Sequence, residues 1–264
     1  MIFAGCSFTW GQGLYYYSGM PTITEPPPDK YIDSLVTDAH REVLKVLRYP
    51  RTVANHFKSF ELVQPWNGGT VERSIAWWKA SLDPYESKVD SNNVPKISPD
   101  EISHLVFQLT HWTRNPFTYT YKNVTTTNSY AYLMHESSIF VDWLKVNNLT
   151  MEQFIQRSVK EVLDMAKDFL QEIERLGIKT TLFTWPDEYV EFIKQDEWLA
   201  DRFVSFEYKG QDYQSIHSLM ENNKELEIKY DYDNFIDPPK DHHPSLKCHE
   251  IMATHLIKHI ESKL

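Results

Sequence analysis

The chain has 264 residues, of which 41% are hydrophobic and 24% charged, and its 27 basic and 37 acidic side chains give a net charge of −10. This length and apolar fraction suit one large α/β domain and exclude long disordered and fibrous classes of protein. An acidic chain without a basic patch has no general attraction for phosphate backbones, which argues against nucleic-acid binding.

The two cysteines, Cys6 and Cys248, cannot build a disulfide framework or a CxxC zinc site. No apolar run reaches the roughly 18–20 residues that a membrane span needs, and the first residues lack the basic start of a signal peptide. We therefore expect a cytoplasmic protein that needs no cofactor and has neither a membrane nor a nucleic acid as its partner.

The first third of the chain alternates strand and helix patterns. Residues 1–5 are typical of a short buried strand, and residues 50–57 of a helix with its proline in the first turn. Residues 60–63 predict a second strand, and the glycine turn at 67–70 leads into an amphipathic helix that carries Ile75, Trp77 and Trp78.

The rest of the chain continues this alternation. Residues 105–109 predict a third strand, which is followed by a loop to about Tyr132 that is rich in Thr, Asn and Tyr. Residues 178–185 predict a fourth strand, 203–206 are compatible with a further one, and 246–264 predict a final helix.

The longest helix is expected over residues 151–176. Thr150 and Gln153 have the spacing of a capping box, apolar residues recur on one face, and Gly177 stops the helix. Helices of such lengths between strands predict an α/β fold with a mostly parallel sheet in three α/β/α layers. We expect a single domain with insertions near residues 15–45, 83–99 and 187–235.

Candidate catalytic residues lie near both ends of the chain. Ser7 follows the first strand, where a hydroxyl and nearby backbone N–H groups can serve acyl transfer. Asp241 and His243 are two apart, so that both side chains share one side of an extended segment, and Pro244 favours that conformation. This pattern predicts a Ser7–His243–Asp241 triad, with Ser245 as the cap of the last helix.

These segments resemble the SGNH (GDSL-like) esterases, and the Gly-Cys-Ser-Phe-Thr start is similar to that of phage-type members. The nucleophile block is resembled by residues 5–9, the glycine of the second block by Gly69 or Gly68, and the Asp-x-(x)-His-Pro block by residues 241–244. The resemblance implies a flavodoxin-like fold with five strands in the order 2-1-3-4-5. It also implies metal-independent ester cleavage, with the N–H groups of Ser7 and Gly69 as oxyanion donors.

The chain departs from the family pattern at two places. Cys6 stands where the family has aspartate, and residues 109–114 lack the asparagine of the third block, which is the third oxyanion donor. Thr110, His111 or Arg114 are candidate substitutes in the same loop, and Asn67 is a candidate in the preceding one. Losing one such donor typically costs about 100–1000-fold in rate.

The expected function is a serine esterase or deacylase that acts on a small acyl ester, such as an O-acetylated carbohydrate. Two alternatives stay open: a degenerate member that binds a glycan or a protein partner without turnover, and an acyltransferase with the same triad. A zinc site formed by Asp241, His242, His243 and His249 is a weaker interpretation because regular metal spacing is absent. The oligomeric state cannot be inferred from these patterns.

Overall fold

A computed structural model of the chain describes residues 1–5, 9, 45–63, 69–82, 96–136, 138–228 and 243–264. It divides into two compact units, one made of residues 1–68 and 204–264 and the other of residues 69–203. The predicted α/β class is confirmed, and the strands of the parallel sheet are β1, β2, β3 and β6. No helix in these ranges is both long enough and apolar enough to cross a membrane.

The first unit contains the beginning and the end of the chain. Its strand β1 pairs in parallel with β2, with Ile2 opposite Leu62, and all three β1 side chains are buried. Its elements are β1 (Ile2–Ala4), α3 (Tyr49–His56), β2 (Leu62–Val63), β7 (Phe206–Tyr208), β8 (Gln211–Tyr213), α10 (Ile216–Asn222), η6 (Lys224–Leu226) and α11 (Leu246–Ser262).

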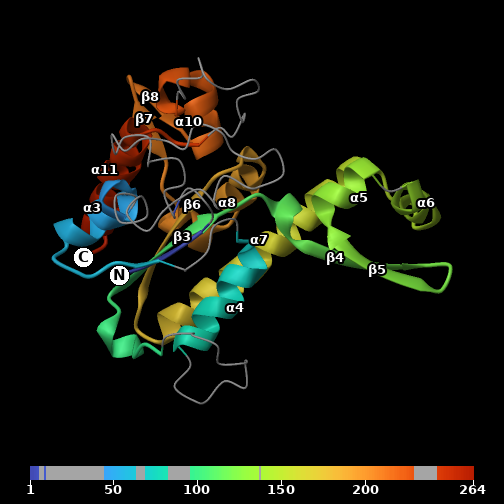
Figure 1. Cartoon of the computed structure of the whole chain (residues 1–264), viewed down its shortest axis with the longest axis horizontal. Helices are drawn as coiled ribbons and strands as arrows, with labels where there is room; N and C mark the ends of the chain where they lie inside the picture. Colours follow the sequence, from blue (N-terminus) through green and yellow to red (C-terminus); the bar gives the residue numbers. More distant parts are fainter. Residues whose placement is uncertain (6–8, 10–44, 64–68, 83–95, 137, 229–242) are drawn as a thin grey trace, which may run out of the picture. The chain divides into compact units, whose positions relative to one another are not determined.

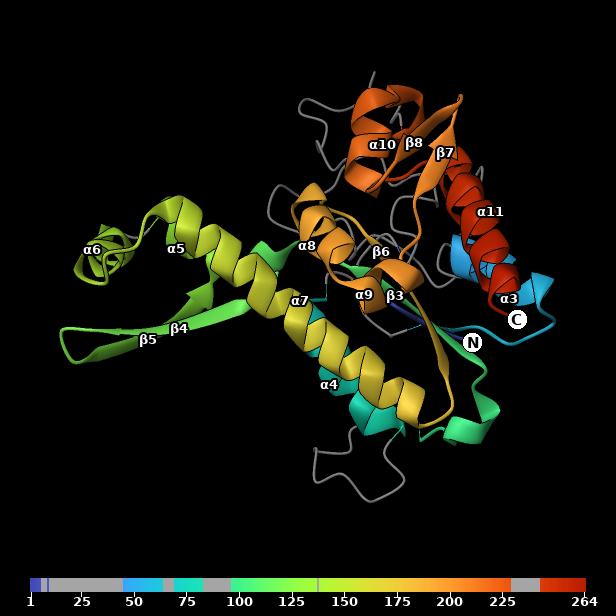
Figure 2. The same cartoon turned by 180° about the vertical axis from the view of Figure 1, so that it is seen from behind.

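Helices α3 and α11 lie side by side in this unit, although about 200 positions separate them in the sequence (Figures 1 and 2). Beside them, the side chain of Glu61 is buried and accepts hydrogen bonds from Arg48 at 2.5 Å and from Arg51 at 2.8 Å. The helices predicted at residues 50–57 and 246–264 are confirmed as α3 and α11, and α3 has its proline in the first turn as expected.

The second unit is built around β3 and β6, which run parallel in the register His104 to Lys179 through Leu109 to Thr184. Every β3 side chain is buried, as is typical of a parallel strand that is covered on both faces. The elements are α4 (Val71–Leu82), η3 (Pro99–Glu101), β3 (His104–Leu109), η4 (Trp112–Arg114), β4 (Pro116–Tyr121), β5 (Val124–Ser129), α5 (Tyr130–Glu136), α6 (Ser138–Val146), α7 (Met151–Arg175), β6 (Lys179–Thr184), η5 (Asp187–Tyr189), α8 (Val190–Gln195) and α9 (Glu197–Arg202).

Helix α7 confirms the capping prediction in both directions. The Gln153 N–H donates to Thr150 Oγ1 at 3.1 Å, and the Thr150 N–H donates to Gln153 Oε1 at 3.0 Å. The helix ends before Gly177, whose φ of +84° is the left-handed conformation that glycine adopts without strain. The buried stripe of α7 packs on α4 and β6.

The prediction of a loop between residue 110 and about Tyr132 is wrong. The structure has a β-hairpin there, in which β4 and β5 are joined at Lys122 and Asn123, both with positive φ, as a two-residue type I′ turn requires. Apolar rings alternate with threonines along β4, and the outward threonines are bonded in cross-strand pairs at 2.7 and 2.9 Å.

The hairpin, α5 and α6 form an arm that extends from the rest of the second unit (Figures 1 and 2). An aromatic cluster holds the arm together, with ring centroids 4.9 to 6.4 Å apart; its members are Trp112, Phe117, Tyr119, Tyr130, Phe140, Trp143 and Phe154. The arm is thus an insertion between β3 and α7, which was not among the predicted insertions.

The region near residues 187–235 also differs from expectation in part. A further strand was expected at residues 203–206. At this place, Phe203 forms a single parallel bridge with Leu182 of β6. The chain then forms an antiparallel β7–β8 hairpin in the first unit, and the helices α8 and α10 lie on either side of this hairpin in the sequence.

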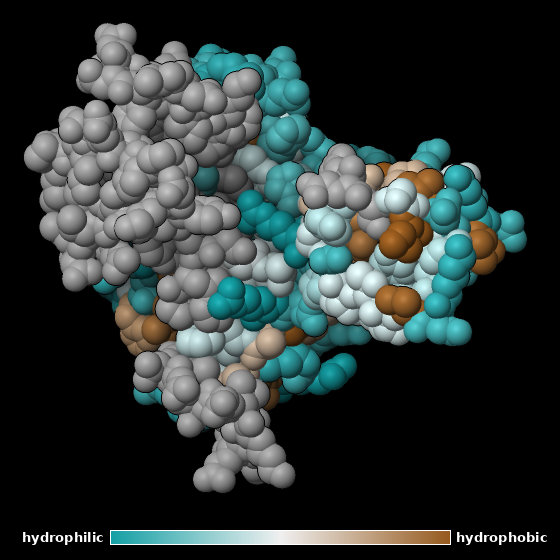
Figure 3. Space-filling model, turned by 45° about the vertical axis from the view of Figure 1, so that its right-hand side comes forward, coloured by the Kyte–Doolittle hydropathy of each residue, from teal (hydrophilic) through white to brown (hydrophobic). Residues whose placement is uncertain are grey.

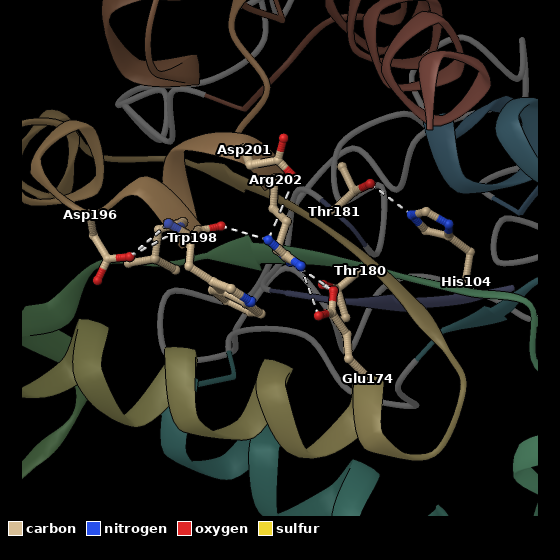
Figure 4. A network of polar contacts seen from close by, with 9 residues as sticks. His104, Glu174, Thr180, Thr181, Asp196, Trp198, Asp201 and Arg202 are labelled. Atoms are coloured by element: carbon tan, nitrogen blue, oxygen red, sulfur yellow. Dashed lines mark hydrogen bonds and ion pairs between the residues drawn. The ribbon is translucent and has the colours of Figure 1, made fainter. Parts of the chain in front are cut away.

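A polar network near the amino ends of β3 and β6 fixes α9 to α7 (Figure 4). Arg202 donates from two nitrogens to Glu174, at 2.7 and 2.8 Å, and its guanidinium stacks 3.8 Å from the ring centroid of Trp198. Glu174 also accepts a hydrogen bond from Thr180 at 2.6 Å. Ligands of open α/β sheets bind at the carboxyl ends of strands, so we assign this network to stability.

Candidate functional site

The predicted site residues divide between described and undescribed parts of the chain. Ser7, Asp241, Gly68 and Asn67 lie outside the described residues, as do most residues of the insertions expected near 15–45 and 83–99. His243 is described in the first unit; Gly69, Thr110, His111 and Arg114 are described in the second. The two groups of described residues belong to different compact units.

His243 lies in an extended segment directly before α11, and its side chain is buried, with 7% of the residue exposed. Its carbonyl accepts a 2.9 Å hydrogen bond from the Ile228 N–H, and the Ser245 N–H donates to the Leu226 carbonyl at 2.7 Å. Pro244 forms an antiparallel bridge with Glu227 between these two bonds. The backbone on both sides of the proposed base is therefore fixed.

Ser245 caps α11 as the sequence predicts. Its Oγ accepts a 3.3 Å hydrogen bond from the Cys248 N–H, in the first turn of the helix. Burial raises the pKa of the Cys248 thiol, which keeps this cysteine protonated and unsuited to act as a nucleophile.

A second histidine, His249, holds the start of α11 against α3. Its Nδ1 accepts a 3.2 Å hydrogen bond from the Tyr49 N–H, and the two rings stack with centroids 5.9 Å apart. Burial, followed by the charges of His243 and Arg48, lowers the pKa of His249 to about 3, so its ring is neutral at neutral pH. The bond from Tyr49 occupies Nδ1, and the described part of the chain holds no group of side chains that could bind a metal ion.

In the second unit, the loop after β3 and the loop before α4 come together. Gly69 is buried just ahead of α4, and the Thr70 Oγ1 accepts from the Arg73 N–H at 3.0 Å. The buried side chain of Asn115 accepts a 3.1 Å bond from the Glu72 N–H and donates at 3.1 Å to the Trp112 carbonyl. Asn115 therefore joins the loop after β3 to the start of α4.

Asn115 was not among the candidate site residues, although it follows residues 109–114 directly in the sequence. Both ends of its amide are engaged in backbone hydrogen bonds, as a buried amide requires. Asn115 thus serves as a link between two loops.

His111 lies in the same loop after β3, and a hydrogen bond defines the role of one of its ring nitrogens. Its Nε2 accepts a 2.6 Å hydrogen bond from the indole Nε1–H of Trp185, the residue that directly follows β6. Because an indole N–H can only donate, Nε2 must be unprotonated, and the proton of the neutral ring is placed on Nδ1. His111 is therefore a hydrogen-bond donor through Nδ1.

Thr110 and Arg114 flank His111 with less definite roles. The Thr110 carbonyl accepts a 3.2 Å bond from the buried Tyr189 hydroxyl, whose pKa is raised well above the usual value by burial. The Thr110 Oγ1 and the Arg114 Nη1 are buried and have no hydrogen-bond partner among the described residues. These three residues thus supply donor groups at the carboxyl end of β3.

Searches of family models, curated proteins and solved structures found no match for this chain.

Proposed function

We propose that the protein is a serine esterase or deacylase of the SGNH type, which hydrolyses a small acyl ester such as an O-acetylated carbohydrate. Ser7 is the nucleophile, His243 the base and Asp241 the group that orients the base. The observation that supports the proposal best is the placement of His243. It lies in an extended segment that two backbone hydrogen bonds hold immediately before the capped helix α11.

The flavodoxin-like strand order 2-1-3-4-5 is part of this proposal. Three of its neighbour relationships are supported by pairs within the units: β1 with β2, β3 with β6, and the single bridge between Leu182 and Phe203. In such a sheet, the loops that follow β1 and β3 leave the same edge, where substrates bind.

The reaction proceeds in two acyl-transfer steps. His243 takes the proton of the Ser7 hydroxyl as its oxygen attacks the ester carbon, and the protonated ring then gives that proton to the departing alcohol. Water, deprotonated by His243, attacks the acyl-enzyme, and Ser7 leaves with the proton. A sugar hydroxyl in place of water would make the same enzyme an acyltransferase.

The oxyanion of each tetrahedral intermediate needs positioned donors. The resemblance assigns the N–H groups of Ser7 and Gly69 to this role. We assign the third donor to the Nδ1–H of His111, because the Trp185 indole fixes that tautomer. His111 thus takes the place of the asparagine that the third block lacks.

The test is turnover of p-nitrophenyl acetate and of an O-acetylated oligosaccharide by the full chain, alongside Ser7→Ala and His243→Ala. Loss of a triad member typically reduces kcat by 10⁴-fold or more, so we expect both variants to fall to the background rate. Wild-type turnover that both variants retain would contradict the triad.

A binding function is the second candidate, and one observation favours it. The arm exposes large apolar side chains at Val124, Ile139 and Val146, each more than half exposed. Figure 3 shows apolar areas on this arm among polar ones. Exposed apolar areas often mark interaction sites, so absence of turnover together with folded protein would favour this candidate.

A further inference from the structure

Tyr49 contacts two segments of the first unit that are distant from each other in the sequence. Its hydroxyl lies 3.0 Å from the Thr9 Oγ1, and both residues are fully buried. Thr9 comes two residues after Ser7 in the sequence. The hydroxyl of Tyr49 is thus bonded to a residue that stands two positions after the proposed nucleophile in the sequence.

The backbone of Tyr49 reaches the other segment. As the first residue of α3, it has an N–H that no carbonyl of its own helix can satisfy, and this N–H donates at 3.2 Å to Nδ1 of His249. His249 lies in the first turns of α11, six residues after His243. Its imidazole also stacks on the Tyr49 ring with an interplanar angle of 19°.

Packing alone does not account for these residue types. A leucine at 249 would fill a buried site without the cost of desolvating an imidazole, and valine at 9 with phenylalanine at 49 would fill the same space without hydroxyls. Two polar pairs are retained, hydroxyl with hydroxyl and N–H with ring nitrogen, while the Nε2 of His249 has no hydrogen-bond partner among the described residues. Such pairs specify one geometry, whereas apolar contacts tolerate sliding.

We propose that Tyr49 is a positioning residue, which uses these two bonds to hold Thr9, two residues after Ser7 in the sequence, at a fixed separation from helix α11, which begins three residues after His243. The inference rests on the proposed esterase function. Acyl transfer needs the serine oxygen within hydrogen-bond reach of the base, and small displacements of reacting groups reduce the rate strongly.

The test measures the second-order rate of Ser7 modification by a fluorophosphonate, together with kcat and KM for p-nitrophenyl acetate. In Tyr49→Phe and in Thr9→Val, we expect the rate and kcat to fall about tenfold with KM within about twofold. Because both variants remove the same bond, the double variant should be no slower than either single one. Thr9→Ser keeps the hydroxyl and should restore the wild-type rate.

Tyr213→Phe is the matched control. Tyr213 is also buried in the first unit, and its hydroxyl bonds at 2.7 Å to Gln211 within the β8 strand, so the variant should keep the wild-type rate. Thermal unfolding of every variant reports the fraction folded.

Wild-type reactivity at Ser7 with unchanged rates in Tyr49→Phe and Thr9→Val would overturn the positioning role alone. Absence of Ser7 modification in folded wild-type protein would overturn the esterase proposal, and the positioning role with it.

Discussion

The indole of Trp185 donates a 2.6 Å hydrogen bond to Nε2 of His111, and so joins the segment after β6 to the segment after β3. The two residues also meet edge to face, with ring centroids 6.2 Å apart. This contact gives His111 a defined tautomer at the edge of the sheet where an α/β enzyme binds its substrate. The donor role of His111 can be tested through Trp185.

His111→Ala removes the proposed third oxyanion donor, and we expect kcat for p-nitrophenyl acetate to fall about 100-fold or more. Trp185→Phe keeps the ring but removes the indole N–H, so the tautomer of His111 is no longer fixed and kcat should fall about tenfold. Trp112→Phe is the control, since its indole donates to Glu188 at 3.4 Å instead of to His111. Equal effects of the two tryptophan variants would contradict the donor role.

The buried imidazole of His249 makes the stability depend on pH. Its folded pKa of about 3 lies below the ordinary value of 6.5, so the unfolded chain binds the proton first. The contribution of His249 to the unfolding free energy is fully present above pH 6.5 and is lost as the pH falls from there toward 3. By pH 5, the loss amounts to about 2 kcal/mol.

The measurement is urea unfolding at pH 7.5 and pH 5 for wild type and for His249→Asn. Asparagine keeps an acceptor for the Tyr49 N–H but does not titrate. We expect the drop in unfolding free energy between the two pH values to be about 2 kcal/mol smaller in the variant. A drop of the same size in both proteins would show that His249 titrates normally.

The Arg202 network predicts a stability effect without an effect on activity. Arg202→Lys keeps the charge but loses the two-nitrogen contact with Glu174 and the stacking on Trp198, so we expect a loss of about 1 kcal/mol in urea unfolding. Arg157→Lys is the control on α7, because its pair with Glu161 is exposed and contributes at most about 0.5 kcal/mol. Similar losses in both variants would contradict the assignment, and kcat should not change in either.

Features that depend on neighbouring residues could be predicted from the sequence. The capping box at Thr150 and Gln153, the stop at Gly177 and the cap at Ser245 are confirmed because each depends on residues within one or two turns. The hairpin at 116–129 carried a local signal as well, since apolar rings alternate with threonine and Asn123 favours positive φ. The abundance of polar residues there was interpreted as a loop instead.

Features that depend on distant residues could not be predicted. The bond from Tyr49 to His249 spans 200 positions, and that from Trp185 to His111 spans 74. No spacing rule connects such pairs, because the packing of separate elements brings them together. The sequence therefore indicated His111 as one of several candidate donors, whereas Trp185 and Tyr49 emerged only from the structure.

The most direct test of the account is mass spectrometry of the intact protein after incubation with a fluorophosphonate, followed by peptide mapping. The measurement covers about pH 6 to 9, the range in which a histidine base becomes neutral. We predict a single adduct on Ser7 that is absent in Ser7→Ala and in His243→Ala. No adduct on Ser7 in folded wild-type protein at any pH in this range would contradict the catalytic triad.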